Sequence, residues 1–264
     1  MGLNLTVLGS SSATPTLQRH PSAYILKSNK RKDYFLIDCG EGTQILMRSA
    51  GIRMQRISRV FISHLHGDHF FGLIGFIFSQ NLFGRTEELH IYAHKPLKKI
   101  INLHLQLEKM NLSYPLVFHT IDMRKKKNYI LHEDTFMEIS TFPLLHSIPT
   151  NGFLFKEKSG SPKDRKTFAY CSDTAYTETF IPYINGVDML YHEATFMEDM
   201  AVAAKEKYHS TAKQAAQIAK LADVKQLIIG HYSARYKDIV PLLVEAKSTF
   251  PNTQAAIEGT IVKV

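Results

Sequence analysis

One short stretch, residues 63–69, limits what this chain can fold into more than any other part of the sequence. It reads Ser-His-Leu-His-Gly-Asp-His and follows an apolar run at 60–62 that is typical of a buried strand. Three imidazoles and a carboxylate this close together cannot all be buried unpaired, because desolvating that many polar groups costs too much free energy. A metal ion removes this cost, since imidazole and carboxylate are good ligands for zinc or manganese. The alternative is a cluster of surface histidines on a loop.

The spacing within this stretch allows two ions. His64 and His66 are two positions apart and can converge from one side of an extended segment. Asp68 and His69 lie past the turn at Gly67 and can face a second ion. The pattern His-x-His-x-Asp-His directly after a strand therefore predicts a metal centre.

Later apolar runs also lead to side chains that can bind metal. Four of them, each expected to be a strand, are followed by His146, Asp173, Glu193 and His231. In open α/β sheets functional residues gather beyond one end of the strands, so side chains from distant parts of the chain would meet there. Asp38 also ends an expected strand, where it either holds a ligand histidine from behind or caps a turn.

A site with two metal ions needs about three protein ligands for each ion and a group that bridges them. We expect seven ligands: His64, His66 and His146 for one ion, Asp68, His69 and His231 for the other, and Asp173 as the bridge. Five further histidines lie in strand or helix patterns without expected partners, and we assign them no role: His90, His94, His104, His119 and His132.

Length and composition are ordinary for a soluble globular protein with a large core. The chain has 264 residues, of which 44% are hydrophobic and 21% charged. No stretch approaches a membrane span, and the start lacks the pattern of a signal peptide. Cys39 and Cys171 suggest no disulfide framework, so we expect a cytoplasmic protein with no membrane or protein partner evident.

The net charge of +8 favours a polyanionic partner. Basic residues gather in five expected turns: 30–32, 53–59, 95–99, 124–127 and 163–166. Each cluster alone is most simply a solvated face, but five together favour RNA or DNA.

The rest of the chain alternates strands with helices. Helices are expected at 43–50, 70–83, 96–110, 201–207, 212–222 and 238–250, and a single strand at 254–264. Thr211 and Gln214 have the spacing of a capping box at the start of one helix. No internal repeat or long linker divides the chain.

The segment 63–69 resembles the signature of the metallo-β-lactamase superfamily. His146, the Cys-Ser-Asp at 171–173 and the Gly-His at 230–231 match its later ligand motifs. Within that superfamily, the His-Glu-Ala-Thr at 192–195 and the His-Ser-Thr at 209–211 resemble the paired motifs of tRNase Z, the endoribonuclease that matures tRNA 3′ ends. The resemblance spans essentially the whole chain.

The resemblance implies an α/β fold of the αββα type, with two mixed β-sheets flanked by helices. Residues 1–264 would form one metallo-β-lactamase-like domain holding two Zn²⁺, with Mn²⁺ as the other possibility. It also implies precursor tRNA as the substrate and a homodimer.

The expected chemistry follows from charge. Two divalent ions with two carboxylate ligands leave a net charge of about +2, which suits a phosphodiester better than an amide. A water bridging two zinc ions would be ionised near neutral pH and attack phosphorus, and Asp68 can orient it. His209 is expected to protonate the leaving 3′-oxygen while Glu193 holds its tautomer, although an ordinary helix-start residue is the alternative. The products would be tRNA with a 3′-hydroxyl and a trailer with a 5′-phosphate.

Three residues are expected to contact substrate. Arg235 is placed to hold a phosphate oxygen with help from Ser233, and a structural salt bridge is the alternative for Arg235. Members of the tRNase Z family carry Pro-x-Lys-x-Arg-Asn after the first strand. Here residues 15–20 retain Arg19 but neither the lysine nor the asparagine.

The segment 156–166 is a short loop where many bacterial relatives carry a long tRNA-binding arm. Either the arm is naturally absent or 159–161 is an artificial linker. We therefore expect a complete chemical centre with weak tRNA affinity. The competing functions are a phosphodiesterase for small or cyclic nucleotides, another hydrolase such as a thioesterase, and a metal-free RNA-binding subunit.

Overall fold

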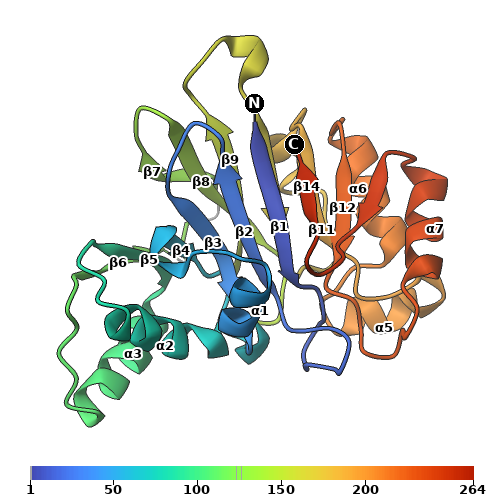
Figure 1. Ribbon diagram of the computed structural model, residues 1–264. Coiled ribbons are helices and arrows are strands. Elements are labelled where there is room, and N and C mark those ends of the chain that lie inside the picture. The colour runs from blue at the N-terminus through green and yellow to red at the C-terminus, as the bar shows by residue number, and fades with distance from the viewer. Residues whose placement is uncertain (1, 123, 126) are drawn as a thin grey trace.

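The computed structural model describes residues 2–122, 124–125 and 127–264. Met1, Met123 and Lys126 lie outside the described residues, and Lys126 belongs to the basic cluster expected at 124–127. The strands form two sheets of seven strands each, and helices cover their outer sides. Figure 1 shows α2 and α3 on one side of the molecule and α6 and α7 on the other. The expected αββα architecture is confirmed.

The first sheet is formed mainly by the N-terminal half. Its strands, in spatial order, are β14 (Ile261–Lys263), β1 (Leu3–Gly9), β2 (Ala23–Ser28), β3 (Tyr34–Cys39), β4 (Ile57–Phe61), β5 (Leu89–His94) and β6 (Leu116–Ile121). Strands β3 to β6 run parallel, whereas β1 pairs antiparallel with both of its neighbours. The carboxyl ends of β3 and β4 therefore meet at one edge of this sheet.

The second sheet has the same mixed character. Its strands, in spatial order, are β13 (Thr253–Ala255), β12 (Leu227–Gly230), β11 (Met189–Glu193), β10 (Thr167–Cys171), β9 (Thr150–Glu157), β8 (Met137–Leu144) and β7 (Tyr129–Glu133). Strands β10 to β13 run parallel, so β10, β11 and β12 end together. Both sheets thus direct several strand ends to one side of the molecule.

The strand expected at 254–264 is wrong as a single element. Its first part is β13 in the second sheet, and its last part is β14 in the first sheet, where Val262 pairs with Leu5. Residues 256–260 cross between the sheets and turn at Gly259, whose φ of 79° favours glycine. One strand cannot pair with both sheets, so the C-terminal segment ties them together.

The six expected helices are present, although α2 begins at Gly67 rather than at 70, and the short helix α4 was not expected. The helices are α1 (Thr43–Ser49), α2 (Gly67–Leu82), α3 (Lys95–Leu107), α4 (Ile181–Ile184), α5 (Ala201–Glu206), α6 (Ala212–Leu221) and α7 (Val240–Thr249), with 3₁₀ turns η1 (Met54–Arg56), η2 (Pro162–Asp164) and η3 (Glu198–Met200). The capping box at the start of α6 is confirmed, because Thr211 Oγ1 accepts from the Gln214 backbone N–H and Gln214 Oε1 accepts from the Thr211 backbone N–H. No described helix has both the length and the apolar character that crossing a membrane requires.

Aromatic side chains fill the space between the two sheets. Phe61 from the first sheet stacks on Tyr92, with ring centres 4.7 Å apart, and meets Phe155 of the second sheet edge-on at 5.3 Å. Such pairs add to the free energy gained from burying the rings. Cys39 and Cys171 are buried and free, as expected for a chain without disulfides. This packed core holds the strand ends in fixed positions.

The short loop between β9 and β10 lies far from those strand ends. Strand β9 starts beside Ser63, whose carbonyl accepts from the Asn151 backbone N–H, and its eight residues run roughly 20–25 Å away from that point. Buried Glu157 receives hydrogen bonds from Ser28 Oγ at 2.5 Å and Lys30 Nζ at 2.9 Å. Lys30 Nζ also donates to the Ser159 carbonyl at 2.8 Å. These contacts fix the base of the loop, which projects near the N-terminus in Figure 1.

Candidate metal centre

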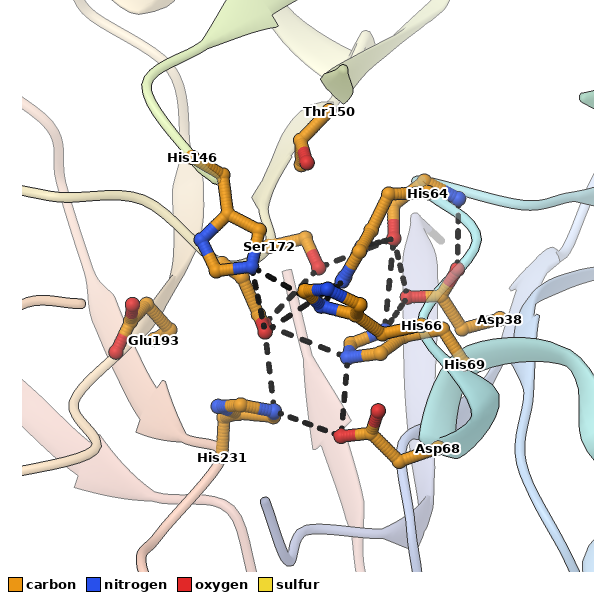
Figure 2. Close-up of polar contacts among 12 residues, drawn as sticks. Asp38, His64, His66, Asp68, His69, His146, Thr150, Ser172, Glu193 and His231 are labelled. Carbon is orange, nitrogen blue, oxygen red and sulfur yellow. Dashed lines mark hydrogen bonds and ion pairs between the residues drawn. The ribbon is translucent and has the colours of Figure 1, made fainter. Parts of the chain in front are cut away.

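The structure brings all seven expected ligands together at the end of the sheets where β4, β8, β10 and β12 finish (Figure 2). Two follow β4, two lie in the first turn of α2, and the other three follow β8, β10 and β12: His64 and His66, Asp68 and His69, then His146, Asp173 and His231. Each side chain is delivered by a strand end or a helix start, which explains how distant parts of the chain meet.

One group of ligand atoms consists of Nε2 of His64, Nε2 of His146, Nδ1 of His66 and Oδ2 of Asp173. His66 Nδ1 lies 3.1 Å from both His64 Nε2 and His146 Nε2. Asp173 Oδ2 lies 3.6 Å from His64 Nε2 and 3.8 Å from His146 Nε2. We call these four residues the first ligand group.

The other carboxylate oxygen of Asp173 belongs to a second group. Asp173 Oδ1 lies 3.4 Å from His69 Nε2 and 3.3 Å from His231 Nε2. Asp68 Oδ2 lies 3.4 Å from each of the same two nitrogens. We call these four residues the second ligand group, and Asp173 is the residue that both groups share.

The spacing of these atoms fits a divalent cation. Ligands bound at about 2.0–2.2 Å in a tetrahedral arrangement lie roughly 3.3–3.6 Å from one another. His69 Nε2 is buried and has no hydrogen-bond partner among the described residues, although it lies against two carboxylates. A buried nitrogen without a hydrogen bond is rare in proteins and is expected where a metal binds. The donors are imidazole and carboxylate, the ligands that suit such a cation.

The electrostatics also favour a cation at the second ligand group. Burial alone would lower the pKa of His69, but the carboxylates of Asp68, Asp173 and Asp38 raise it well above its ordinary value. Burial lowers the pKa of His64 well below its ordinary value, so that its imidazole is neutral and able to bind metal. Positive charge is therefore stabilised at the second group, where a divalent cation would lie.

Buried Asp38 holds the first sheet's ligands in place. Its carboxylate accepts from the Ser63 backbone N–H at 2.8 Å, Ser63 Oγ at 2.9 Å, His69 Nδ1 at 2.8 Å and the Tyr170 hydroxyl at 2.8 Å. Ser63 Oγ in turn lies 3.0 Å from His64 Nδ1. Of the two roles considered for Asp38, the structure shows contact with a ligand histidine. Such partners orient the imidazole and fix its tautomer.

Buried Glu193 has the equivalent position in the second sheet. Its Oε1 lies 2.8 Å from His209 Nδ1, and its Oε2 accepts from Thr195 Oγ1 at 2.7 Å. Thr195 Oγ1 lies 2.9 Å from His231 Nδ1. Burial alone would lower the pKa of His209, but the charge and hydrogen bond of Glu193 raise it to about 9. His209 can also approach a metal, since it groups with Asp173 and His231.

Sequence reasoning missed the residues that support the ligands from behind. Ser63 directly precedes His64, and Thr195 follows Glu193 by two positions, so their place beside ligand motifs is a usable signal. Tyr170, the next-to-last residue of β10, gives no such signal, because nothing in the sequence shows that its hydroxyl reaches Asp38. The backbone carbonyl of Tyr208, which accepts from His146 Nδ1 at 2.8 Å, gives none either.

The three residues expected to contact substrate come from the loops after β1 and after β12. Arg19 donates to the carbonyls of Tyr236 at 2.6 Å and Ser233 at 3.3 Å, so it joins two loops. The Arg235 guanidinium lies 5.0 Å from the centre of the Phe196 ring, and its Nε lies 3.3 Å from Ser233 Oγ. Arg235 is exposed and forms no ion pair with any residue that the structure describes. Their contact with substrate stays a prediction.

The expectation that the other histidines lack partners is wrong. His90 Nδ1 lies 3.0 Å from His119 Nε2, because the two residues are diagonal neighbours on the adjacent strands β5 and β6, where His90 lies opposite Val117 and His119 lies opposite Tyr92. Each of the others also packs against a neighbour: His94 Nε2 lies 2.7 Å from Asn151 Oδ1, His132 Nε2 lies 3.1 Å from Asp134 Oδ2, and the His104 ring lies 5.3 Å from that of Phe78. Cross-strand partners are set by register, which the sequence alone does not give.

Replacing Asp38 with Asn tests the support of the second ligand group. The amide keeps the shape of the side chain but removes the charge that orients His69. We expect Asp38→Asn to weaken metal affinity by about 10- to 100-fold. Competition with a coloured chelator measures this affinity. Asp188→Asn is the control, because Asp188 bonds to Thr167 and Lys225, away from the centre. Unchanged metal affinity in Asp38→Asn would show that His69 needs no such support.

The comparisons with known proteins agree with this geometry. A family model described as Anti-Pycsar protein Apyc1 matches residues 3–250. Ribonuclease Z of Bacteroides fragilis is 39% identical over 303 aligned positions, which cover 98% of each chain. The crystal structure of the short form of human tRNase Z (ELAC1) superposes with a TM-score of 0.85 at 28% identity and covers 99% of each chain.

The metallo-β-lactamase fold protein YhfI from Bacillus subtilis superposes with a TM-score of 0.81 at 21% identity, also over 99% of each chain, and this likeness shows the fold. The resemblance read from the motifs is thus confirmed. With its metallo-β-lactamase fold and matches along nearly its whole length, the chain belongs to the ribonuclease Z family and to the family described as Anti-Pycsar protein Apyc1.

Proposed function

We propose that this protein is a metal-dependent endoribonuclease that removes the 3′ trailer from precursor tRNA. The products are tRNA with a 3′-hydroxyl and a trailer with a 5′-phosphate. The observation that carries the proposal is the position of Asp173, whose two oxygens lie in two adjacent ligand groups. This arrangement suits two divalent ions on either side of a phosphodiester. We assign them as Zn²⁺, with Mn²⁺ as the alternative. The names of the relatives supply tRNA as the substrate.

Bound metal would supply an ionised water at neutral pH and neutralise negative charge on the phosphate. The residues of the chain orient the reaction. Asp68 accepts a hydrogen bond from the attacking water and directs it to phosphorus. The Asp68 carboxylate is itself held, because its Oδ2 accepts from the Ala13 backbone N–H at 2.8 Å. The loop after β1 thus steadies the residue that aims the nucleophile.

His209 is the proposed proton donor to the leaving 3′-oxygen. Its Nδ1 is held by Glu193 at 2.8 Å, so the proton to be transferred lies on Nε2. The ring stands beside the ligands, with its centre 5.2 Å from that of His146 and 5.4 Å from that of His231. A donor at this distance from both ligand groups can reach an oxygen of a phosphate bound between them.

The short loop at 156–166 bears on substrate affinity. The Bacteroides fragilis alignment is 303 positions long, although this chain has only 264 residues, so the relative carries residues that this chain lacks within the aligned region. We keep a single domain, a homodimer and a cytoplasmic location as parts of the proposal, and of these the homodimer rests on the resemblance alone.

A phosphodiesterase for small or cyclic nucleotides is the second candidate. The observation that favours it is the shortness of the same loop, because a small substrate needs no distant contact.

Incubation with a 3′-extended precursor tRNA tests the main proposal. We expect a single cut at the start of the trailer, with the end groups given above, and no cut after metal removal by a chelator. Sequencing of the product ends measures this. A parallel assay with cyclic nucleotides serves as the comparison. Rapid turnover of those nucleotides without any cut in the tRNA would favour the second candidate.

Replacing His209 with Ala should slow the tRNA cut by about 10²- to 10⁴-fold, because the leaving 3′-oxygen loses its proton donor. A diester with a p-nitrophenolate leaving group needs no proton, so its hydrolysis should change much less. Metal content should stay at the wild-type value. His104→Ala, away from the centre, is the control. Loss of metal with an unchanged rate per loaded site would instead make His209 a ligand.

The loop at 156–166 predicts weak tRNA binding. We expect a dissociation constant for precursor tRNA in the micromolar range or above, since the contacts of a long arm are missing. Filter binding at several salt concentrations measures it, because phosphate contacts weaken as salt rises. Hydrolysis of a small diester in the same preparation shows that the centre is intact. Nanomolar affinity would contradict the prediction.

A further inference from the structure

A second hollow lies beside the metal centre and is not part of it. This hollow, which we call the side pocket, has a volume of about 590 Å³. Val202 and Lys205 of α5 form part of its wall, and Tyr208 and His209 between α5 and α6 form another part. The rest includes Leu145, which precedes the ligand His146, and Tyr176, which follows the ligand Asp173. None of the seven expected metal ligands lines it.

Among the residues that the structure describes, His209 alone lines both hollows. The hollow that contains His66, Asp68, Asp173 and His231 also includes His209 on its wall. The proposed proton donor therefore stands between the metal centre and the side pocket. Tyr208 strengthens this connection, because its carbonyl accepts from His146 Nδ1 and its exposed ring opens onto the side pocket.

We propose that the side pocket binds the nucleobase of the nucleotide whose 3′-oxygen leaves. The assignment rests on the proposed function, in which His209 protonates that oxygen. The sugar that carries this oxygen must lie next to His209. From there its base can reach the side pocket, because His209 lines both that pocket and the hollow that holds the metal ligands. For a precursor tRNA this is the last nucleotide of the mature tRNA.

The chemistry of the side pocket suits a nucleobase. Tyr176 and Tyr208 are partly exposed aromatic rings on its wall, and Leu145 and Val202 are exposed apolar side chains. Bases bind such walls by stacking without requiring a given sequence. Lys205 is exposed at the wall and can neutralise the next phosphate along the chain. Exposed apolar groups gathered around a hollow are typical of a binding site.

The trailer nucleotide is assigned to the opposite side. The hollow that contains the metal centre extends to Phe71 on α2, whose side chain is 64% exposed, and to Pro15 and Glu41. The two nucleosides flanking the cut would thus bind on different elements, one near α5 and one near α2. The assignment gives the RNA a direction across the centre.

Two mononucleotides distinguish the two sides. Adenosine 3′-monophosphate with its phosphate at the metals places its base in the side pocket. Adenosine 5′-monophosphate places its base on the Phe71 side. Titration calorimetry on the zinc-loaded full chain gives a dissociation constant for each, and it does so without any cleavage. Tyr176 is the residue to change, because it lies on the pocket wall and touches no expected ligand among the described contacts.

Tyr176→Ala should weaken binding of adenosine 3′-monophosphate about tenfold, the size expected for one lost stacking contact. Binding of adenosine 5′-monophosphate should change by less than about twofold, which also shows that the variant is folded and loaded. Tyr176→Phe keeps the ring and should bind both as the wild type does.

Equal weakening of the two nucleotides, no weakening, or selective weakening of adenosine 5′-monophosphate would overturn the assignment. Cleavage of precursor tRNA by the wild type is measured separately. If the tRNA stays uncut while the nucleotide pattern appears, the side pocket stands and the proposed substrate falls.

Discussion

Two buried carboxylates hold the rest of the centre in place. Asp38 ends a strand of the first sheet and Glu193 ends a strand of the second, and each contacts one histidine ring directly. Each also accepts a hydrogen bond from a hydroxyl group, Asp38 from Ser63 and Glu193 from Thr195. The Ser63 hydroxyl lies next to Nδ1 of His64, and the Thr195 hydroxyl lies next to Nδ1 of His231. Each sheet thus contributes one buried carboxylate that orients two imidazoles, one directly and one through a hydroxyl group. The metal centre lies between these two carboxylates.

Burial makes these carboxylates effective and also constrains them. A carboxylate removed from water costs several kcal/mol of free energy unless hydrogen bonds replace its hydration. Asp38 receives four hydrogen bonds, and its φ of 53° is a strained backbone conformation for a residue other than glycine. The same four hydrogen bonds, from Ser63, His69 and Tyr170, hold the Asp38 carboxylate in this conformation. Contacts within the fold therefore orient the ligand histidines beside it.

The part of the centre that could be predicted from sequence is the part that is local. The ligands within residues 63–69 are close in sequence, so their spacing can be read directly. The later ligands follow strands that run in the same direction, and such strands end at the same edge of a sheet. Contacts that depend on register could not be predicted. Tyr170 of β10 in the second sheet reaches Asp38 of β3 in the first sheet, and the segment after β13 crosses to the other sheet. That His66 presents Nδ1 whereas its neighbours present Nε2 is a matter of rotamer, which the sequence pattern does not contain.

The fold places the metal ligands and the loop at 156–166 at opposite ends of strand β9. The ligands and His209 lie at one end of the strands, while the loop at 156–166 lies a strand's length away. Contacts made at that distance change how tightly a large RNA binds, but they do not alter the distances among the ligands. On the proposed function, a shortened loop lowers affinity for a large partner and leaves hydrolysis of a small diester intact. One set of metal ligands can then serve more than one class of diester, and on the proposal for the side pocket the residues beside His209 select among them.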